Sequence, residues 1–210
     1  MSQAASDAPH SRYKSLLLFG APGVGKGTQG EVLGKLPGFH HCSTGDMFRQ
    51  LDKTSELGKL CASFGAKGQL VPDEVTIRVW EEGMRFRISA GLYSPARDLL
   101  ILDGLPRTVA QVAMIEKHVD VQKVIHLTCS NPEEMVRRLK LRAIKSGRVD
   151  DAKEEVIRKR WEVYQAETQP VLNCYARGLI ADVEGIDTPV NVLANILAVV
   201  RPLYDAHTAR

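Results

Sequence analysis

The stretch GAPGVGKGT, residues 20–28, decides the fold of this chain. It follows the apolar run at residues 15–19, and it fits the template of a glycine, four residues, a second glycine and a lysine, with a hydroxyl close behind. Glycines let a backbone wrap closely around a phosphate, because a Cβ would block both positive φ values and close approach. Successive N–H groups then form an anion nest at the positive end of a helix that we expect to begin near Gly25. Residues 20–28, called the phosphate loop below, therefore predict a binding site for the phosphates of a nucleotide.

Three residues at the end of the phosphate loop have expected roles. Lys26 supplies a mobile positive charge for the outer phosphates. Gly27 stands where most loops of this type carry Ser or Thr, and the hydroxyl comes one place later, at Thr28.

The composition is that of an ordinary globular protein. A chain of 210 residues, 44% hydrophobic and 25% charged, suits one substantial α/β domain. The formal net charge of +3 argues against non-specific nucleic-acid binding, which needs a concentrated basic face. No apolar run approaches the roughly 20 residues that span a bilayer, and residues 1–12 lack the apolar core of a signal peptide. We therefore expect a cytoplasmic protein, with a disordered tail over residues 1–12 and a single domain over residues 13–210.

The cysteine and histidine positions argue against a structural metal. The four cysteines include no Cys-x-x-Cys pair, which excludes the usual zinc signatures and indicates reduced thiols. His40 and His41 form the one histidine cluster, and because we expect no carboxylate or thiol partners near them, a loop or strand-end role is favoured over metal binding. The cysteines are Cys42, Cys61, Cys129 and Cys174.

Short apolar runs alternate with helical patterns, which is typical of βαβ units and a parallel sheet. Helices are expected after the phosphate loop, and after Asn131 as an N-cap with Pro132 at the first helical position. A long helix is expected over residues 152–175, kinked or broken at Pro170, and a last one over residues 189–204. The predicted strands cover residues 15–19, 39–42, 99–102, 123–127 and 179–183.

Two further features bear on the chemistry. Asp103 ends the buried strand predicted at residues 99–102, where it is well placed to hold Mg²⁺ through water beside the phosphate loop. Residues 43–91 are too long for a simple crossover, so they predict a small helical insertion between the second and third strands.

Five motifs occur together in an order that resembles the adenylate kinase family, of the type with a short lid. The resemblance covers residues 15–200 and is far more specific than the phosphate loop alone. It implies a three-layer α/β/α fold of the P-loop NTPase type with a five-stranded parallel sheet, a helical monophosphate-binding insertion at about 43–72 and a short lid at about 142–152. The motifs are GAPGVGKGTQ (20–29), HCSTGDMFR (41–49), QLVPD (69–73), DGLPRTxxQ (103–111) and SGRVDD (146–151).

The resemblance implies reversible phosphoryl transfer from MgATP to AMP, giving two ADP, in a closed site lined by Arg, Lys and Mg²⁺. Mg²⁺ would arrive with ATP, with Asp103 holding it through water and no protein atom binding it directly. The lid lacks the long insertion and the cysteines of zinc-bearing relatives, so no structural zinc is expected. The implied partners are ATP, AMP and ADP, with no nucleic acid and no membrane, and the implied state is a monomer.

The resemblance also assigns site residues. The catalytic set is Lys26, Asp103, Arg107, Arg148 and Arg160. The ATP-binding set is Gly23, Val24, Gly25, Lys26, Gly27, Thr28, Arg138, Arg142, Gly185 and Ile186. The AMP-binding set, with Arg107 on the phosphate and Gln111 on the base edge, is Thr44, Arg49, Gln69, Leu70, Val71, Gly104, Leu105, Pro106, Arg107, Gln111, Arg148 and Arg160.

The chain departs from the family pattern at two places. Leu105 stands where the family usually has Phe, and one extra residue lies between the Asp150-Asp151 pair and Arg160. Two other functions stay open: a UMP/CMP kinase on the same fold, and a non-catalytic nucleotide-binding sensor. Thr44 favours adenine, because pyrimidine-specific relatives tend to carry a small apolar residue there. The presence of every charged residue needed for transfer argues against a sensor.

Overall fold

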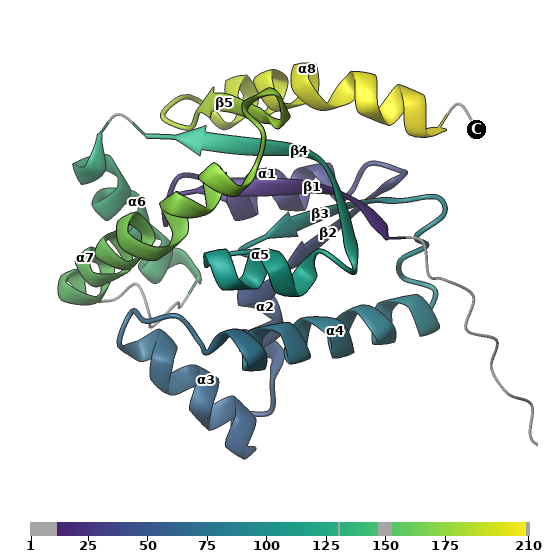
Figure 1. Ribbon diagram of the computed structural model, residues 1–210. Coiled ribbons are helices and arrows are strands. Elements are labelled where there is room, and N and C mark those ends of the chain that lie inside the picture. The colour runs from purple at the N-terminus through teal and green to yellow at the C-terminus, as the bar shows by residue number, and fades with distance from the viewer. Residues whose placement is uncertain (1–11, 130, 147–152, 209–210) are drawn as a thin grey trace, which may run out of the picture.

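The computed structural model (Figure 1) describes residues 12–129, 131–146 and 153–208. Its centre is a five-stranded sheet in the order β2-β3-β1-β4-β5, and every strand pair is parallel. This arrangement confirms the predicted fold class, and all five predicted strands are present. The strands are β1 (Tyr13–Gly20), β2 (Phe39–Ser43), β3 (Leu99–Asp103), β4 (Val119–Thr128) and β5 (Ile180–Glu184).

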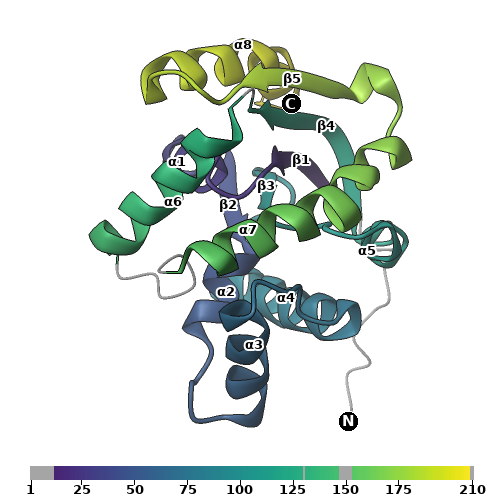
Figure 2. The ribbon, with the colours of Figure 1, turned by 90° about the vertical axis from the view of Figure 1, so that its left-hand side faces the viewer.

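Helices cover both faces of this sheet. The central strands β1 and β3 are buried on both sides, so neighbouring residues of one strand enter different cores. Leu17 and Leu102 pack on one side with residues of α2, α4 and α5, whereas Leu16 and Ile101 pack on the other with residues of α1, α6 and α8. Figure 2 shows α1 and α5 on opposite sides of the strands. The helices are α1 (Lys26–Leu33), α2 (Thr44–Gln50), α3 (Glu56–Ala66), α4 (Asp73–Ser89), α5 (Val109–Ile115), α6 (Pro132–Ser146), α7 (Glu154–Val163) and α8 (Pro189–Thr208).

The prediction of one long helix over residues 152–175 is wrong in detail. Residue 152 lies outside the described residues, and α7 ends at Val163. A π-helical turn (Tyr164–Thr168) and a 3-10 segment (Gln169–Cys174) follow it. Pro170 lies in the 3-10 segment; it has no N–H to donate and its ring crowds the preceding turn, so it disfavours a regular α-helix there.

Local capping sets where several helices begin. Ser43 accepts a hydrogen bond from the backbone N–H of Asp46 at the start of α2, at 3.2 Å. The Asn131 side chain accepts from the backbone of Glu133 (3.1 Å) at the start of α6, as predicted from the sequence. Residues 43–91 form α2, α3 and α4, and α3 projects away from the sheet in Figure 2.

The described helices are all too short or too polar to cross a bilayer. That finding covers residues 12–129, 131–146 and 153–208.

The buried sheet should dominate stability. Ile101 is 0% exposed in β3, whereas Ile144 on α6 is 81% exposed. We expect Ile101→Ala to lower the free energy of unfolding by about 2–5 kcal/mol, because it removes buried methyl groups and leaves a cavity. The same change at Ile144 should cost less than about 0.5 kcal/mol. Denaturant unfolding of both variants measures the difference, and equal losses would contradict this account of the core.

Candidate active site

The carboxyl ends of the three strands β1, β2 and β3 bring the predicted site together. Parallel strands end at the same edge of a sheet, where ligands of open α/β folds bind. Asp103, the last residue of β3, is in register with Leu18 of β1 on one side and Ser43 of β2 on the other. Three segments therefore lie near Asp103: the phosphate loop, the start of α2 and the segment after β3.

The phosphate loop needs its glycines for two different reasons. Gly20 has a φ of 139°, and a Cβ there would lie 2.4 Å from the carbonyl oxygen of Leu127, so close packing against β4 excludes a side chain. Gly25 has a φ of 113° and is the N-cap of α1. A Cβ added there would have no heavy atom within 4 Å apart from those of its two chain neighbours. The positive end of α1 is therefore open beside the loop, as an anion site requires.

Lys26 is folded back against the loop that carries it. Its Nζ donates to the carbonyl oxygens of Gly20 (2.6 Å) and Ala21 (3.0 Å). Burial lowers the pKa of Lys26 to about 8; Asp103 opposes this shift, and the nearby arginines, Arg107 first, add to it. The ammonium group is thus held among other positive charges, an arrangement that a bound phosphate would stabilise.

Asp103 lies beside Lys26 and has a partner that the sequence did not indicate. The His41 Nε2 atom is 3.6 Å from Asp103 Oδ2, and both side chains are 11% exposed. Burial disfavours the Asp103 carboxylate, but His41, Lys26 and Arg107 outweigh it, so its pKa lies below the ordinary value. The expectation that the histidines lack a carboxylate partner is therefore wrong for His41, because β2 pairs directly with β3.

A cleft of about 930 Å³ opens beside these residues. It is lined by Lys26, by α2 and α3, and by side chains of α7 and the π-helical turn. Thr44 and Leu105 of the predicted AMP-binding set do not line it; they are buried, and the Thr44 hydroxyl donates to the carbonyl oxygen of Gly104 at 2.9 Å. The members of that set that line the cleft are Arg49, Gln69, Leu70, Val71, Gly104, Pro106, Arg107, Gln111 and Arg160.

The side chain of Arg107 is held by the segment from which it comes. Its Nε donates to the carbonyl oxygen of Gly104 (2.9 Å), and its backbone N–H donates to the side-chain oxygen of Gln111 (2.7 Å). Burial lowers the pKa of Arg107 to about 10; Arg160 and Arg49 add to this shift, and Asp103 opposes it. Arg107 still carries its charge at neutral pH, so the cleft presents a fixed cation to an anion.

Six of the ten predicted ATP-binding residues belong to the phosphate loop, and two of the others, Arg138 and Gly185, meet beside it. Arg138 on α6 donates to the carbonyl oxygen of Gly185 at 2.9 Å. A Cβ on Gly185 would lie 2.5 Å from a Val24 methyl group, so the segment after β5 packs directly on the phosphate loop. Arg142 lies close enough to Lys26 to affect its pKa. Arg148 and the Asp150-Asp151 pair lie outside the described residues.

Comparison with known proteins places this site in a family. The family model for adenylate kinase matches residues 18–179. The chain belongs to the adenylate kinase family.

Bacterial adenylate kinases are similar along most of their length. That of Clavibacter michiganensis subsp. michiganensis is 40% identical over 207 residues, which is 92% of this chain and 98% of the relative. That of Flavobacterium psychrophilum is 41% identical over 167 residues, 77% of this chain and 84% of the relative. That of Thermus thermophilus is 35% identical over 191 residues, which is 88% of this chain and 96% of the relative. This adenylate kinase family member is therefore an enzyme of phosphoryl transfer to nucleoside monophosphates.

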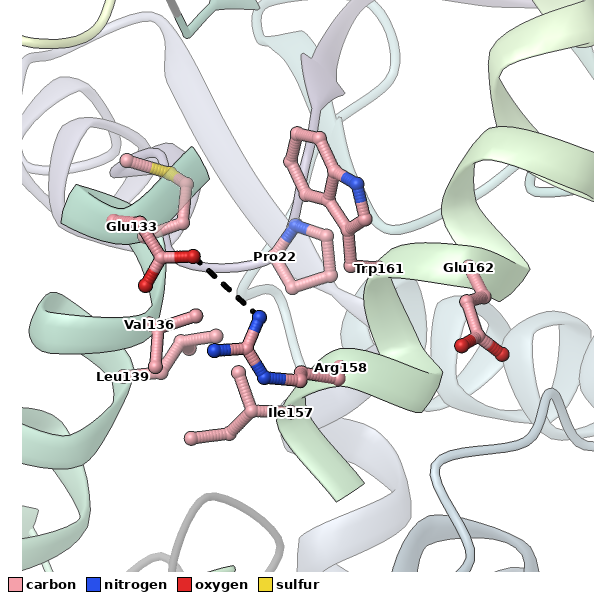
Figure 3. A pocket seen from close by; sticks show the side chains of 9 residues that line it. Pro22, Glu133, Val136, Leu139, Ile157, Arg158, Trp161 and Glu162 are labelled. Carbon is pink, nitrogen blue, oxygen red and sulfur yellow. Dashed lines mark hydrogen bonds and ion pairs between the residues drawn. The ribbon is translucent and has the colours of Figure 1, made fainter. Parts of the chain in front are cut away.

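A second, smaller cavity of about 210 Å³ lies between α6 and α7 (Figure 3). Its wall is mainly apolar, and the Arg158 guanidinium approaches the Glu133 carboxylate within 3.5 Å beside it. This cavity shares Pro22 of the phosphate loop with the cleft, and its other lining residues are neither cleft residues nor predicted site residues. The full lining is Pro22, Glu133, Met135, Val136, Leu139, Ile157, Arg158, Trp161 and Glu162.

Sequence reasoning gives no role to several residues that the structure brings to the cleft. Lys153 and Tyr164 line it, and Asp73 accepts hydrogen bonds from Thr108 (2.9 Å) and Gln111 (2.7 Å). Asp73 does belong to the QLVPD motif. The helix dipole alone explains an acidic residue at the start of a helix, so the sequence does not indicate a further role for Asp73. Within the described part of the chain, no three His, Cys, Asp or Glu side chains are grouped as a metal site.

The lowered pKa of Lys26 makes phosphate binding pH-dependent. Lys26 is partly neutral near pH 8 in the free protein, and bound phosphates raise its pKa, so binding of a nucleoside triphosphate at pH 8 should take up protons. Affinity should fall as the pH rises above about 8. Calorimetry in two buffers of different ionisation enthalpy measures the uptake. Lys26→Met should abolish this part of the uptake, whereas Lys35→Met on the exposed surface should not; equal uptake by the unmodified protein and Lys26→Met would contradict the assignment.

Proposed function

We propose that this enzyme transfers a phosphoryl group reversibly from MgATP to AMP and forms two ADP. The observation that carries the proposal is the group of cations around the end of β3. Lys26, Arg107 and Arg160 line one cleft, and the charge of Arg160 contributes to the lowered pKa of both Lys26 and Arg107. Such a group suits the several negative charges of two phosphate chains that meet there.

The cleft supports the acceptor side of the proposal. Its walls include apolar residues such as Leu70 and Val71 beside polar atoms of Gln111, which suits a base, and Arg107 suits a phosphate. We assign AMP to this cleft, with the phosphate on Arg107 and the base edge on Gln111. The helical segment at about 43–72 would then be the monophosphate-binding insertion.

The phosphate loop supports the donor side. Its backbone N–H groups and Lys26 would hold the ATP phosphates, as the open N-terminus of α1 allows. Arg138 and the backbone at Gly185 and Ile186 lie beside the loop and would contact the rest of ATP. The proposed lid at about 142–152, with Arg148, falls largely outside the described residues.

The residues present fit a hydrated Mg²⁺ bound with ATP. Asp103 is a buried carboxylate with a lowered pKa, and a Cβ on Gly27 would lie only 3.6 Å from its Oδ2 atom. The absence of a side chain at Gly27 therefore leaves room between the phosphate loop and Asp103 for a water-mediated contact. When bound, Mg²⁺ neutralises charge on the phosphates.

The chain's own contribution to the reaction is positioning and charge. Arg107 and Arg160 would orient the acceptor phosphate for in-line attack, and Lys26 would stabilise charge on the transferred group. Burial of these groups in the cleft strengthens their electrostatic effect, because little water screens them. We also expect a monomeric, cytoplasmic enzyme.

The test is an acceptor panel. The purified protein is incubated with MgATP and, separately, AMP, CMP, UMP or GMP, and diphosphate formation is measured. Fast ADP formation with AMP alone supports the proposal. A preference for CMP or UMP would indicate a pyrimidine monophosphate kinase on this fold. Tight binding of ATP and AMP without transfer would indicate a nucleotide sensor.

Two substitutions test the assigned roles. Lys26→Met and Arg107→Ala should each reduce turnover by about two orders of magnitude or more, because each removes a charge that stabilises the transition state. Neither should unfold the protein, which thermal unfolding checks. Lys35→Met and Arg201→Ala, both exposed, serve as matched controls and should have normal kinetics. Near-normal turnover of either site variant would overturn its role.

A further inference from the structure

The side-chain amide of Gln111 is held in one orientation. Its Nε2 donates to Asp73 Oδ1 at 2.7 Å, and its Oε1 accepts from the backbone N–H of Arg107 at 2.7 Å. A carboxylate oxygen only accepts and a backbone N–H only donates, so a flipped amide would lose both bonds and face like groups instead. Gln111 is 1% exposed, so losing either bond would leave a buried polar group without its partner.

Asp73 is itself held in place by Thr108, which precedes the helix that contains Gln111. Its Oδ2 accepts from the Thr108 hydroxyl at 2.9 Å, and the Thr108 hydroxyl oxygen accepts from the backbone N–H of Gln111 at 3.1 Å. Asp73 is the first residue of α4, whereas Thr108 is the N-cap of α5. One carboxylate thus joins the starts of two helices and sets the direction of an amide between them.

The fixed amide of Gln111 still has hydrogen-bonding groups that a ligand could use. Gln111 lines the cleft, and after its two internal bonds it keeps one N–H donor and one carbonyl lone pair. A neighbouring donor and acceptor match the edge of adenine, where N1 accepts and the 6-amino group donates. Hypoxanthine in the same orientation presents the reverse order, because its N1–H donates and its O6 accepts, so it would need the amide flipped.

We propose that Asp73 is a positioning residue for base specificity: by orienting the Gln111 amide, it makes the acceptor site select a 6-aminopurine over a 6-oxopurine. The inference rests on the proposed binding of AMP in this cleft. Asp73 does not touch the base, and its effect is transmitted through the amide alone. A neutral amide at position 73 could donate to a flipped Gln111, so Asp73→Asn would weaken the constraint.

The test compares AMP with IMP, which differ only at the base edge. Calorimetry gives the affinity of the full chain for each, so the result does not depend on turnover. We expect the unmodified protein to prefer AMP, and Asp73→Asn to reduce the ratio of the two affinities by about tenfold or more. The matched control is Thr108→Ala, which loses the hydroxyl bond to Asp73 and the cap of α5 but leaves the side-chain bond between Asp73 and Gln111 in place. It should lower the thermal midpoint with little change in the ratio.

Other outcomes would overturn the inference. An unmodified protein without a preference for AMP over IMP would do so, and so would a folded Asp73→Asn variant with an unchanged ratio, since Asp73 would then only anchor α4. If Asp73→Asn does not fold, Asp73→Ser, which also removes the carboxylate next to Gln111, serves the same comparison. Failure of the proposed function is seen separately, as no ADP formation by the unmodified protein.

Discussion

The parallel pairing of β1 with β3 is the interaction on which the rest of the site depends. It places the phosphate loop, which follows β1, beside Asp103, which ends β3. The strand register also brings His41 of β2 to the same carboxylate. Because β1 and β3 are buried on both faces, a shift of their register by one residue would move their side chains between two different cores. The packing of the sheet therefore also fixes the geometry of the charged groups.

Those charged groups are arranged for a ligand more than for stability. Burial lowers the pKa of Lys26 to about 8 and of Arg107 to about 10, and each cation lies near others. Without phosphates, Lys26 is satisfied by two carbonyl oxygens of its own loop. Lys26 would exchange these bonds for a phosphate, whereas Arg107 is already held at the cleft by its bond to Gly104.

The second level of organisation is a set of contacts between polar side chains from separate elements. Asp73, Thr108 and Gln111 connect the start of α4 with α5 and with the segment that carries Arg107. This network couples the helical segment that lines the cleft to the strand that ends in Asp103. A displacement at the start of α4 would therefore also move Gln111 and Arg107, which we assign to the base and to the phosphate.

The sequence by itself determined the parts of this protein that rest on local patterns. The phosphate loop, the buried strands and the cap at Asn131 all follow from neighbouring residues, because φ values, apolar runs and N-caps are local properties. The tertiary structure alone decided the pairing of His41 with Asp103, the orientation of Gln111 by Asp73, and the change from α7 to a π-helical turn. Asp73 and Gln111 are 38 residues apart, and no local pattern records which distant side chains meet. Only the packing of α4 and α5 against one face of the sheet sets that distance.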